Sequence, residues 1–269
     1  RFTASIADKT GKVFLAYTPV PEVKAEDVKL PPKVENPKEP KEYASAELAY
    51  HVGLRLDQFH NGILDPVPYY KRALEIDPDY SKANLAMGVR LAKNGSYAEA
   101  KPYLEKAVAR ATQNHTRALD AAPEYYLALT ERALGNLKRA EDLFWRCTWR
   151  STHKKESFFE IVRICCLQGR YAEAHEVLEY SALPLGMDEA KFHTLHAYLH
   201  RRLAGDSDAT AEQRSSWRKL AKSNQDKAFK CDPLEYWGVI EEAFREGKSG
   251  ADALALAEKN RGLKAQQLL

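Results

Sequence analysis

The sequence is poor in cysteine, nearly balanced in charge and free of long apolar runs. Four cysteines in 269 residues are too few for the disulfide framework of a small secreted protein. The net charge of +3, from 41 basic and 38 acidic residues, creates no strong field that would attract nucleic acid or an anionic membrane. No stretch approaches the roughly 18 apolar residues needed to cross a bilayer. We therefore expect a folded chain with reduced thiols, no nucleic-acid partner and no membrane insertion.

The motifs of common catalytic and cofactor chemistry are also absent. The sequence has no Gly-rich phosphate loop, no nucleophile elbow and no pair of cysteines at zinc-ligand spacing. The dipeptide His175-Glu176 lacks the second histidine of the His-Glu-x-x-His zinc motif. We expect no enzymatic activity in this chain and no cofactor, while the activity of a longer parent protein stays open.

The first 18 residues differ from everything after them. Phe2, Ala4 and Ile6 alternate with polar residues, a turn sequence occupies residues 8–11, and an apolar run follows at residues 13–17. This pattern predicts a β-hairpin over residues 1–18. Because an isolated hairpin is marginally stable in water, we expect it to pack on the helices or to be the edge of a preceding β domain, and we favour the second.

Residues 19–43 are rich in proline, lysine and glutamate, which predicts an extended, semi-rigid linker of about 3 Å per residue. The chain begins at Arg1 without a methionine or a signal segment, which indicates a piece of a longer protein. The compartment is therefore left open. The thiols slightly favour the cytoplasm, and a periplasmic or secreted location stays possible.

From residue 44 to residue 269 the apolar spacing is helical, and it repeats. Gly88, Ala100 and Ala107 are small residues at places where two paired helices have to approach closely. The same small-residue positions recur at Gly53 and Ala73, at Ala128 and Ala140, at Ala174, and at Ala221 and Ala228. In the last of these copies the two helices are separated by a polar loop, residues 205–213. One pair cannot bury its apolar face alone, so successive pairs are expected to stack.

This recurring set of small-residue positions, the repeat grid, resembles the tetratricopeptide repeat (TPR) pattern over about four-fifths of the chain. The resemblance implies an all-α fold, a right-handed TPR superhelix of about five helix pairs plus a C-terminal cap, preceded by the hairpin and the linker. It also implies a non-catalytic scaffold that binds a peptide or protein segment in its concave groove. If the grid is correct, Gly88→Leu overpacks the helix seam and costs about 1–3 kcal/mol or more.

A narrower resemblance involves residues 11–17, the linker, and residues 50–54 and 65–74. Together they look like the helical C-terminal part of large bacterial proteins with an N-terminal galactose-mutarotase-like β-sandwich domain of unknown function. This implies an alternative role, the helical accessory region of a carbohydrate-active or carbohydrate-binding protein whose active site lies on a missing β domain. The partner would then be an adjoining β domain of the same chain.

The groove positions of the TPR family carry over to aromatic and basic residues in this sequence. They are Tyr50, Lys82, Lys93, Tyr125, Arg132, Phe159, Arg163, Tyr198 and Arg202. An extended ligand with acidic and apolar groups would fit such a surface, although an ordinary solvated face also carries charges of this kind. Reversing Arg132 and Arg163 to Glu is expected to weaken binding without lowering stability.

Two further clusters are weaker candidates. His193, His196 and His200 follow one stripe of a helix and could hold Zn²⁺ or Ni²⁺, but no carboxylate or thiolate joins them at ligand spacing. We therefore interpret them as packing histidines and expect no metal. Cys165 and Cys166 could form a redox site, yet neighbouring residues on a helix point in different directions, which favours a structural role.

Overall fold

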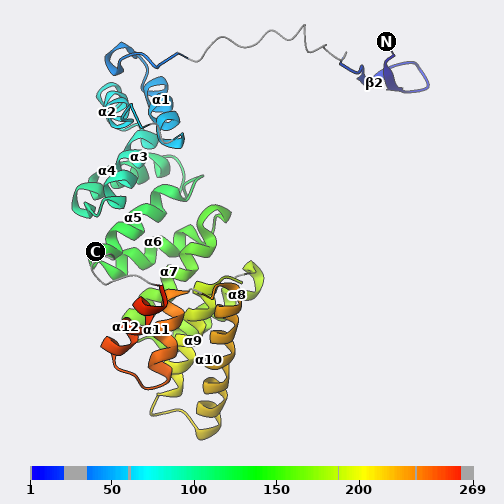
Figure 1. The fold of residues 1–269 in the computed structure, drawn as a ribbon. Coiled ribbons are helices and arrows are strands. Elements are labelled where there is room, and N and C mark those ends of the chain that lie inside the picture. Colours follow the sequence, from blue (N-terminus) through cyan, green and yellow to red (C-terminus); the bar gives the residue numbers. More distant parts are fainter. Residues whose placement is uncertain (1, 21–34, 60–61, 187, 234, 262–269) are drawn as a thin grey trace. The chain divides into compact units, whose positions relative to one another are not determined.

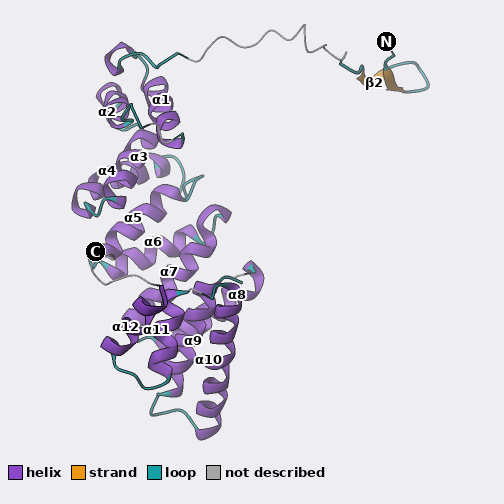
Figure 2. Ribbon diagram, in the orientation of Figure 1, coloured by secondary structure: helices purple, strands orange, loops and turns teal. Residues whose placement is uncertain are grey.

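The computed structural model describes residues 2–20, 35–59, 62–186, 188–233 and 235–261. The chain divides into two compact units, Arg1–Lys38 and Glu39–Leu269. Figure 2 shows strand in the first unit and helices throughout the second.

The first unit contains the predicted β-hairpin. Strand β1 (Ala4–Ala7) pairs antiparallel with β2 (Val13–Tyr17). The carboxylate of Asp8 accepts hydrogen bonds from the backbone N–H groups of Thr10 at 2.8 Å and Lys12 at 3.0 Å, and so closes the turn. Every side chain of the two strands is exposed. The hairpin is confirmed, while its origin in a preceding β domain stays a prediction.

Twelve α-helices occupy the described part of the second unit, and Figure 1 shows them stacked as consecutive pairs. They are α1 (Ala46–Gln58), α2 (Val67–Ile76), α3 (Ser81–Lys93), α4 (Tyr97–Thr112), α5 (Ala122–Ala133), α6 (Leu137–Cys147), α7 (Lys154–Leu167), α8 (Tyr171–Leu185), α9 (Ala190–Ala204), α10 (Ala211–Cys231), α11 (Tyr236–Arg245) and α12 (Gly250–Arg261). Five pairs and a final pair, α11 with α12, agree with the predicted superhelix and cap. Among the residues that the structure describes, no helix is long and apolar enough to cross a bilayer.

The linker predicted for residues 19–43 lies partly outside the described residues, which resume at residue 35. Its described end packs on the first helix pair. The short 3-10 helix η2 (Pro40–Glu42) precedes Tyr43, whose carbonyl oxygen accepts a hydrogen bond from Nε of Arg72 at 3.1 Å. The ring of Tyr43 also makes an edge contact with Tyr69. For this reason the compact second unit begins at Glu39, slightly before the predicted position 44.

The same glycine turn ends the first helix of the second, third and fourth pairs. Gly95, Gly135 and Gly169 have φ values of +81°, +85° and +76°. After the first of them, the N–H of Ser96 donates to the carbonyl of Leu91 at 2.9 Å, as in a Schellman motif. A left-handed backbone suits glycine because it has no Cβ, so the repeated glycine fixes the turn within each pair.

The small residues of the grid lie where the paired helices touch. A Cβ built at Gly53 would lie 2.7 Å from Cε1 of Tyr70, and one at Gly88 would lie 2.6 Å from Cγ of Leu104. Ala100 is fully buried. Larger side chains at these positions would push the helices apart, as the sequence pattern predicts.

The largest apolar core runs through the third, fourth and fifth pairs without a break. Phe144, Phe158, Ile161, Leu178 and Leu199 are among its fully or almost fully buried members. They come from α6, α7, α8 and α9. This shared core fixes these helices relative to one another and so supports the surface described below.

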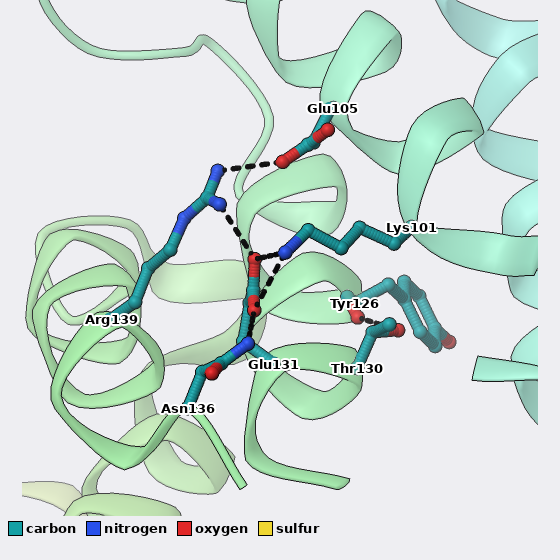
Figure 3. Close-up of polar contacts among 7 residues, drawn as sticks. All are labelled: Lys101, Glu105, Tyr126, Thr130, Glu131, Asn136 and Arg139. Atoms are coloured by element: carbon teal, nitrogen blue, oxygen red, sulfur yellow. Dashed lines mark hydrogen bonds and ion pairs between the residues drawn. The ribbon is translucent and has the colours of Figure 1, made fainter. Parts of the chain in front are cut away.

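A buried carboxylate links α4, α5 and α6 (Figure 3). Glu131 is fully buried and pairs with Nζ of Lys101 at 3.1 Å and Nη1 of Arg139 at 2.8 Å. Nδ2 of Asn136 donates a further hydrogen bond at 2.6 Å. Because two cations and an amide surround the carboxylate, its burial is compensated.

Candidate functional site

An apolar pocket of about 210 Å³ lies between α9 and α11, the first helices of the last two pairs. Its lining residues are Thr194, Leu195, Tyr198, Arg201, Trp237, Ile240, Glu241 and Phe244. Trp237 and Phe244 are 47% and 38% exposed, which is high for such large apolar side chains. Exposed aromatic side chains around a concave apolar surface are typical of binding sites.

The pocket is built by helix periodicity and by one ion pair between its two helices. Trp237, Ile240 and Phe244 follow the i, i+3, i+7 spacing that places side chains on one face of α11. The guanidinium of Arg201 on α9 contacts both carboxylate oxygens of Glu241 on α11, at 2.5 and 2.9 Å. Burial raises the pKa of Glu241, and Arg201 opposes that shift. This two-point contact fixes the two helices against each other.

A polar strip continues from the pocket to α7 and α5. The guanidinium of Arg163 lies over the ring of Trp237, 5.3 Å from its centroid, and over Phe159 at 5.7 Å. Nη1 of Arg163 is 2.8 Å from Oε1 of Glu160, and Nε of Arg132 is 3.0 Å from Oε2 of the same carboxylate. Glu160 is only 7% exposed. We call the pocket together with Arg132, Glu160 and Arg163 the groove strip.

The structure therefore brings several predicted groove residues to one surface. Tyr198 lines the pocket, while Arg163 and Arg132 form the polar end of the strip. Phe159 is buried beneath Arg163 and makes an edge contact with Phe192 at 5.0 Å between ring centroids. It supports the strip without offering much surface to a ligand.

Two other predicted aromatic residues serve helix packing. Tyr50 is half-buried against Tyr70 and Tyr80, and burial raises the pKa of its hydroxyl. Tyr125 stacks on His153 with ring centroids 4.4 Å apart, and burial raises its pKa to about 12. Both rings therefore take part in packing, which limits what they can offer to a ligand.

The remaining predicted cations lie on the surface. Lys82 and Lys93 are exposed at the two ends of α3. Arg202 is exposed on α9, with its guanidinium 4.8 Å from the centroid of Tyr171. Arg202 directly follows Arg201 of the pocket, and both line an adjoining hollow between the last turn of α9 and the loop after it.

Most of the pocket was not predicted from the sequence. No groove residue was placed on α11, because the end of the repeat region was expected to form a C-terminal cap. A terminal repeat usually has a polar outer face, so the apolar stripe Trp237, Ile240 and Phe244 was the available signal. Leu195 lies three residues before the predicted groove residue Tyr198 on the same face of α9, but its role in the pocket depends on the contact between α9 and α11.

The predicted histidine stripe is divided between two environments. Nε2 of His193 lies 2.7 Å from a carboxylate oxygen of Asp188. His200 makes ring contacts with His196 and with His175 of α8, at centroid distances of 5.9 and 5.2 Å. The local spacing alone thus selected only two members of the cluster that forms.

The cysteine pair shows the environment of structural thiols. Burial raises the pKa of Cys165 to about 11 and that of Cys166 to about 12. Both side chains are therefore protonated at neutral pH. Since the thiolate is the reactive form of cysteine, these environments disfavour the redox interpretation.

Comparison with known proteins identifies the fold. No protein family model matches the chain. The PilF structure of Pseudomonas aeruginosa is 17% identical, with 82% of this chain and 91% of PilF aligned at a TM-score of 0.57. YrrB, described as a TPR protein with an unusual peptide-binding site, is 18% identical over 75% of this chain and 94% of its own, at a TM-score of 0.56. MamA is 17% identical over 71% and 95%, at a TM-score of 0.54.

These likenesses, together with the repeat grid, establish that the second unit has the TPR solenoid fold. They are evidence for the fold only, because the sequence identities are low. The narrower resemblance to proteins with a galactose-mutarotase-like domain stays a prediction.

Proposed function

We propose that this chain is a non-catalytic interaction module that binds a protein segment along the groove strip. A bulky apolar side chain of the segment enters the pocket between α9 and α11, and acidic groups next to it face Arg163 and Arg202. The observation that carries this proposal is the apolar pocket, whose lining includes the exposed aromatic side chains of Trp237 and Phe244.

The size of the pocket favours a single side chain. Sites for drug-sized ligands and cofactors are clefts of about 300–1,000 Å³, whereas this pocket has about 210 Å³. Its walls are mostly aromatic and aliphatic, and its charged members Arg201 and Glu241 pair with each other. Such a site gains binding energy mainly by removing an apolar side chain from water.

The charge of the strip favours acidic neighbours for that anchor. Arg132 and Arg163 share one carboxylate, Glu160, so this end of the strip carries an excess positive charge. Arg163 is also the residue in contact with Trp237 at the edge of the pocket. A carboxylate on the bound segment would therefore be steered to this end of the strip.

The same ion pairs support a binding role over a catalytic one. Glu160 and Glu241 each hold arginine partners in place. A general acid or base needs to exchange its proton with a substrate, whereas these carboxylates are occupied in fixing helices. Fold likeness to YrrB, described as having a peptide-binding site, supports the same proposal.

The proposal is tested by selecting peptides from a random phage-displayed library with the whole chain and measuring the affinity of the best synthetic peptide. We expect a sequence with one large apolar residue next to acidic residues. Trp237→Ala should weaken its binding at least about tenfold. Trp149→Ala is the matched control, because Trp149 is 56% exposed and lies outside the pocket. Equal affinity of the wild type and Trp237→Ala would overturn the proposal.

Charge reversal of both arginines, which the sequence suggested as a test, does not suit this structure. Arg132→Glu with Arg163→Glu would place two further carboxylates against the buried Glu160, and the fold would lose stability. Arg163→Gln alone leaves Arg132 to compensate Glu160. We expect this single variant to lower the affinity for acidic peptides more than for neutral ones.

A further inference from the structure

We propose that α8 and α9 together hold a Zn²⁺ ion through two side chains from each helix. The four ligands are His175, Glu179, His196 and His200. In each helix the two ligands are four residues apart, which places them on the same face one turn from each other. The proposed ion would cross-link the fourth and fifth pairs at α9, the helix that also carries the pocket residues Tyr198 and Arg201.

Ligand atoms of three of the four side chains lie close together, and the fourth side chain lies next to one of the three. One ligand atom each from His175, Glu179 and His200 lie within 4.8 Å of one another. Nδ1 of His196 lies 3.9 Å from Oε1 of the same glutamate. Two ligands of a tetrahedral Zn²⁺, each about 2.0–2.1 Å from the metal, are about 3.4 Å apart. To reach that spacing, the four side chains have to rotate toward a common centre.

Two buried nitrogens of these side chains have no hydrogen-bond partner. His200 is only 2% exposed, and its Nε2 has no hydrogen-bond partner. Nδ1 of His175 is also buried without one. Buried polar atoms are normally paired, because leaving one unpaired costs its full desolvation penalty. The other nitrogen of the His200 ring, Nδ1, lies 3.4 Å from the amide nitrogen of Asn224, a contact that helps to set the orientation of the ring.

The electrostatics of the cluster suit a cation that takes nitrogen and oxygen ligands. Imidazole nitrogens and carboxylate oxygens are both ordinary ligands of Zn²⁺. Glu179 provides a negative charge, and its side chain is 52% exposed, which leaves a path from solvent. The other ionisable groups that act on His196 are His193 on its own helix and Lys227 on α10.

A second group with ligand-like spacing serves as an internal control. Asp188, His193 and Cys231 also bring donor atoms within 4.8 Å of one another. Asp188 and Cys231 are exposed, and the histidine already has the carboxylate of Asp188 as its partner at 2.7 Å. This group has none of the orphaned nitrogens of the α8 and α9 cluster, and we assign no metal to it.

The test is a Zn²⁺ titration of the whole chain, freed of metal by a chelator and carrying no histidine tag, in competition with a chromophoric chelator. We expect one equivalent of tightly bound Zn²⁺. Glu179→Gln and His196→Gln should each weaken binding at least about tenfold. Glu176→Gln, an exposed glutamate on the same helix, and His193→Gln are the matched controls and should leave the affinity unchanged. Co²⁺ bound in place of Zn²⁺ should give the intense visible absorption of a tetrahedral site.

Three results would overturn the proposal. One is the absence of stoichiometric Zn²⁺ binding by the wild type. Another is an affinity that survives Glu179→Gln, a substitution at a half-exposed side chain that leaves the fold intact. The third is a loss of binding in His193→Gln, which would place the ion at the second group instead.

Discussion

At the scale of single residues, Gly88 lies where an added side chain would collide with buried neighbours. Its missing Cβ would lie 2.6 Å from Cγ of Leu104 and 3.4 Å from the carbonyl oxygen of Ala100. Leu104 and Ala100 are fully buried and have little room to move. We expect Gly88→Leu to lower the free energy of unfolding by about 1–3 kcal/mol or more in a urea titration. Gly62→Ala is the control, because nothing lies within 4 Å of that position. Equal losses in both variants would contradict this account.

The buried carboxylate of Glu131 allows a second residue-scale prediction. Glu131→Ala leaves Lys101 and Arg139 without their shared counter-charge and opens a cavity in the α4, α5 and α6 contact. The cations are 29% and 50% exposed, so water recovers part of the loss. We expect a decrease of about 2–4 kcal/mol in the free energy of unfolding. Glu105→Ala removes the other partner of Arg139, a 40% exposed carboxylate, and should cost at most about 1 kcal/mol.

If Glu131→Ala were as stable as Glu105→Ala, the buried Glu131 would contribute no more to the free energy of unfolding than the exposed Glu105. The comparison is informative because both substitutions remove a carboxylate that contacts the same guanidinium. They differ in burial, so the difference between them measures what burial adds.

At the scale of helices, the start of α10 shows how capping sets a boundary. The sequence placed a polar loop over residues 205–213, whereas the helix begins at Ala211. The hydroxyl of Thr210 accepts from the N–H of Gln213 at 3.1 Å, and the Gln213 side chain accepts from the N–H of Thr210 at 2.9 Å. This reciprocal capping box satisfies two N–H groups. We expect Thr210→Ala to lower the free energy of unfolding by about 1 kcal/mol, measured by thermal unfolding. Thr112→Ala, at the C-terminal end of α4, should lower it by less.

Local signals explain why the helices were predictable and the site was only partly so. Gly95 and Gly135 end helices through their own backbone geometry. Ala100 and Ala107 are small because they face the paired helix, which is the neighbouring helix in the sequence. Such features can be recognised in a short window. The pocket instead needs α9 to contact α11, although α10 separates these two helices in the sequence. Spacing within one helix does not encode that contact.

The histidine cluster illustrates the same limit. His196 and His200 are visible as a pair four residues apart, and the sequence placed His193 with them. The partners that join them, His175 and Glu179, lie on the preceding helix. Their role depends on the relative rotation of α8 and α9. The shared apolar core fixes that rotation, and helix periodicity does not.

At the scale of the whole molecule, stability should be distributed along the solenoid in a graded way. In repeat proteins each unit contacts only its neighbours, so local stability follows local packing. The largest core cluster spans α5 to α9, while the first pair has a small separate cluster around Ala49 and Ala73. We expect the amides of α7 and α9 to exchange hydrogen most slowly and those of α1 and α2 faster. Uniform exchange over both regions would show a single cooperative unit.

The same nearest-neighbour logic predicts how far a local defect spreads. Gly88→Leu strains the contact between α3 and α4, and the third and fourth pairs separate that seam from the fifth pair, α9 with α10. Hydrogen exchange in the variant should therefore accelerate in α3 and α4 and in the adjacent α2 and α5, with α9 and α10 nearly unchanged. Gly62→Ala provides the reference in which no helix changes. Acceleration of all helices by the same factor would mean that the pairs unfold together, and the pocket on α9 would then depend on every pair of the solenoid.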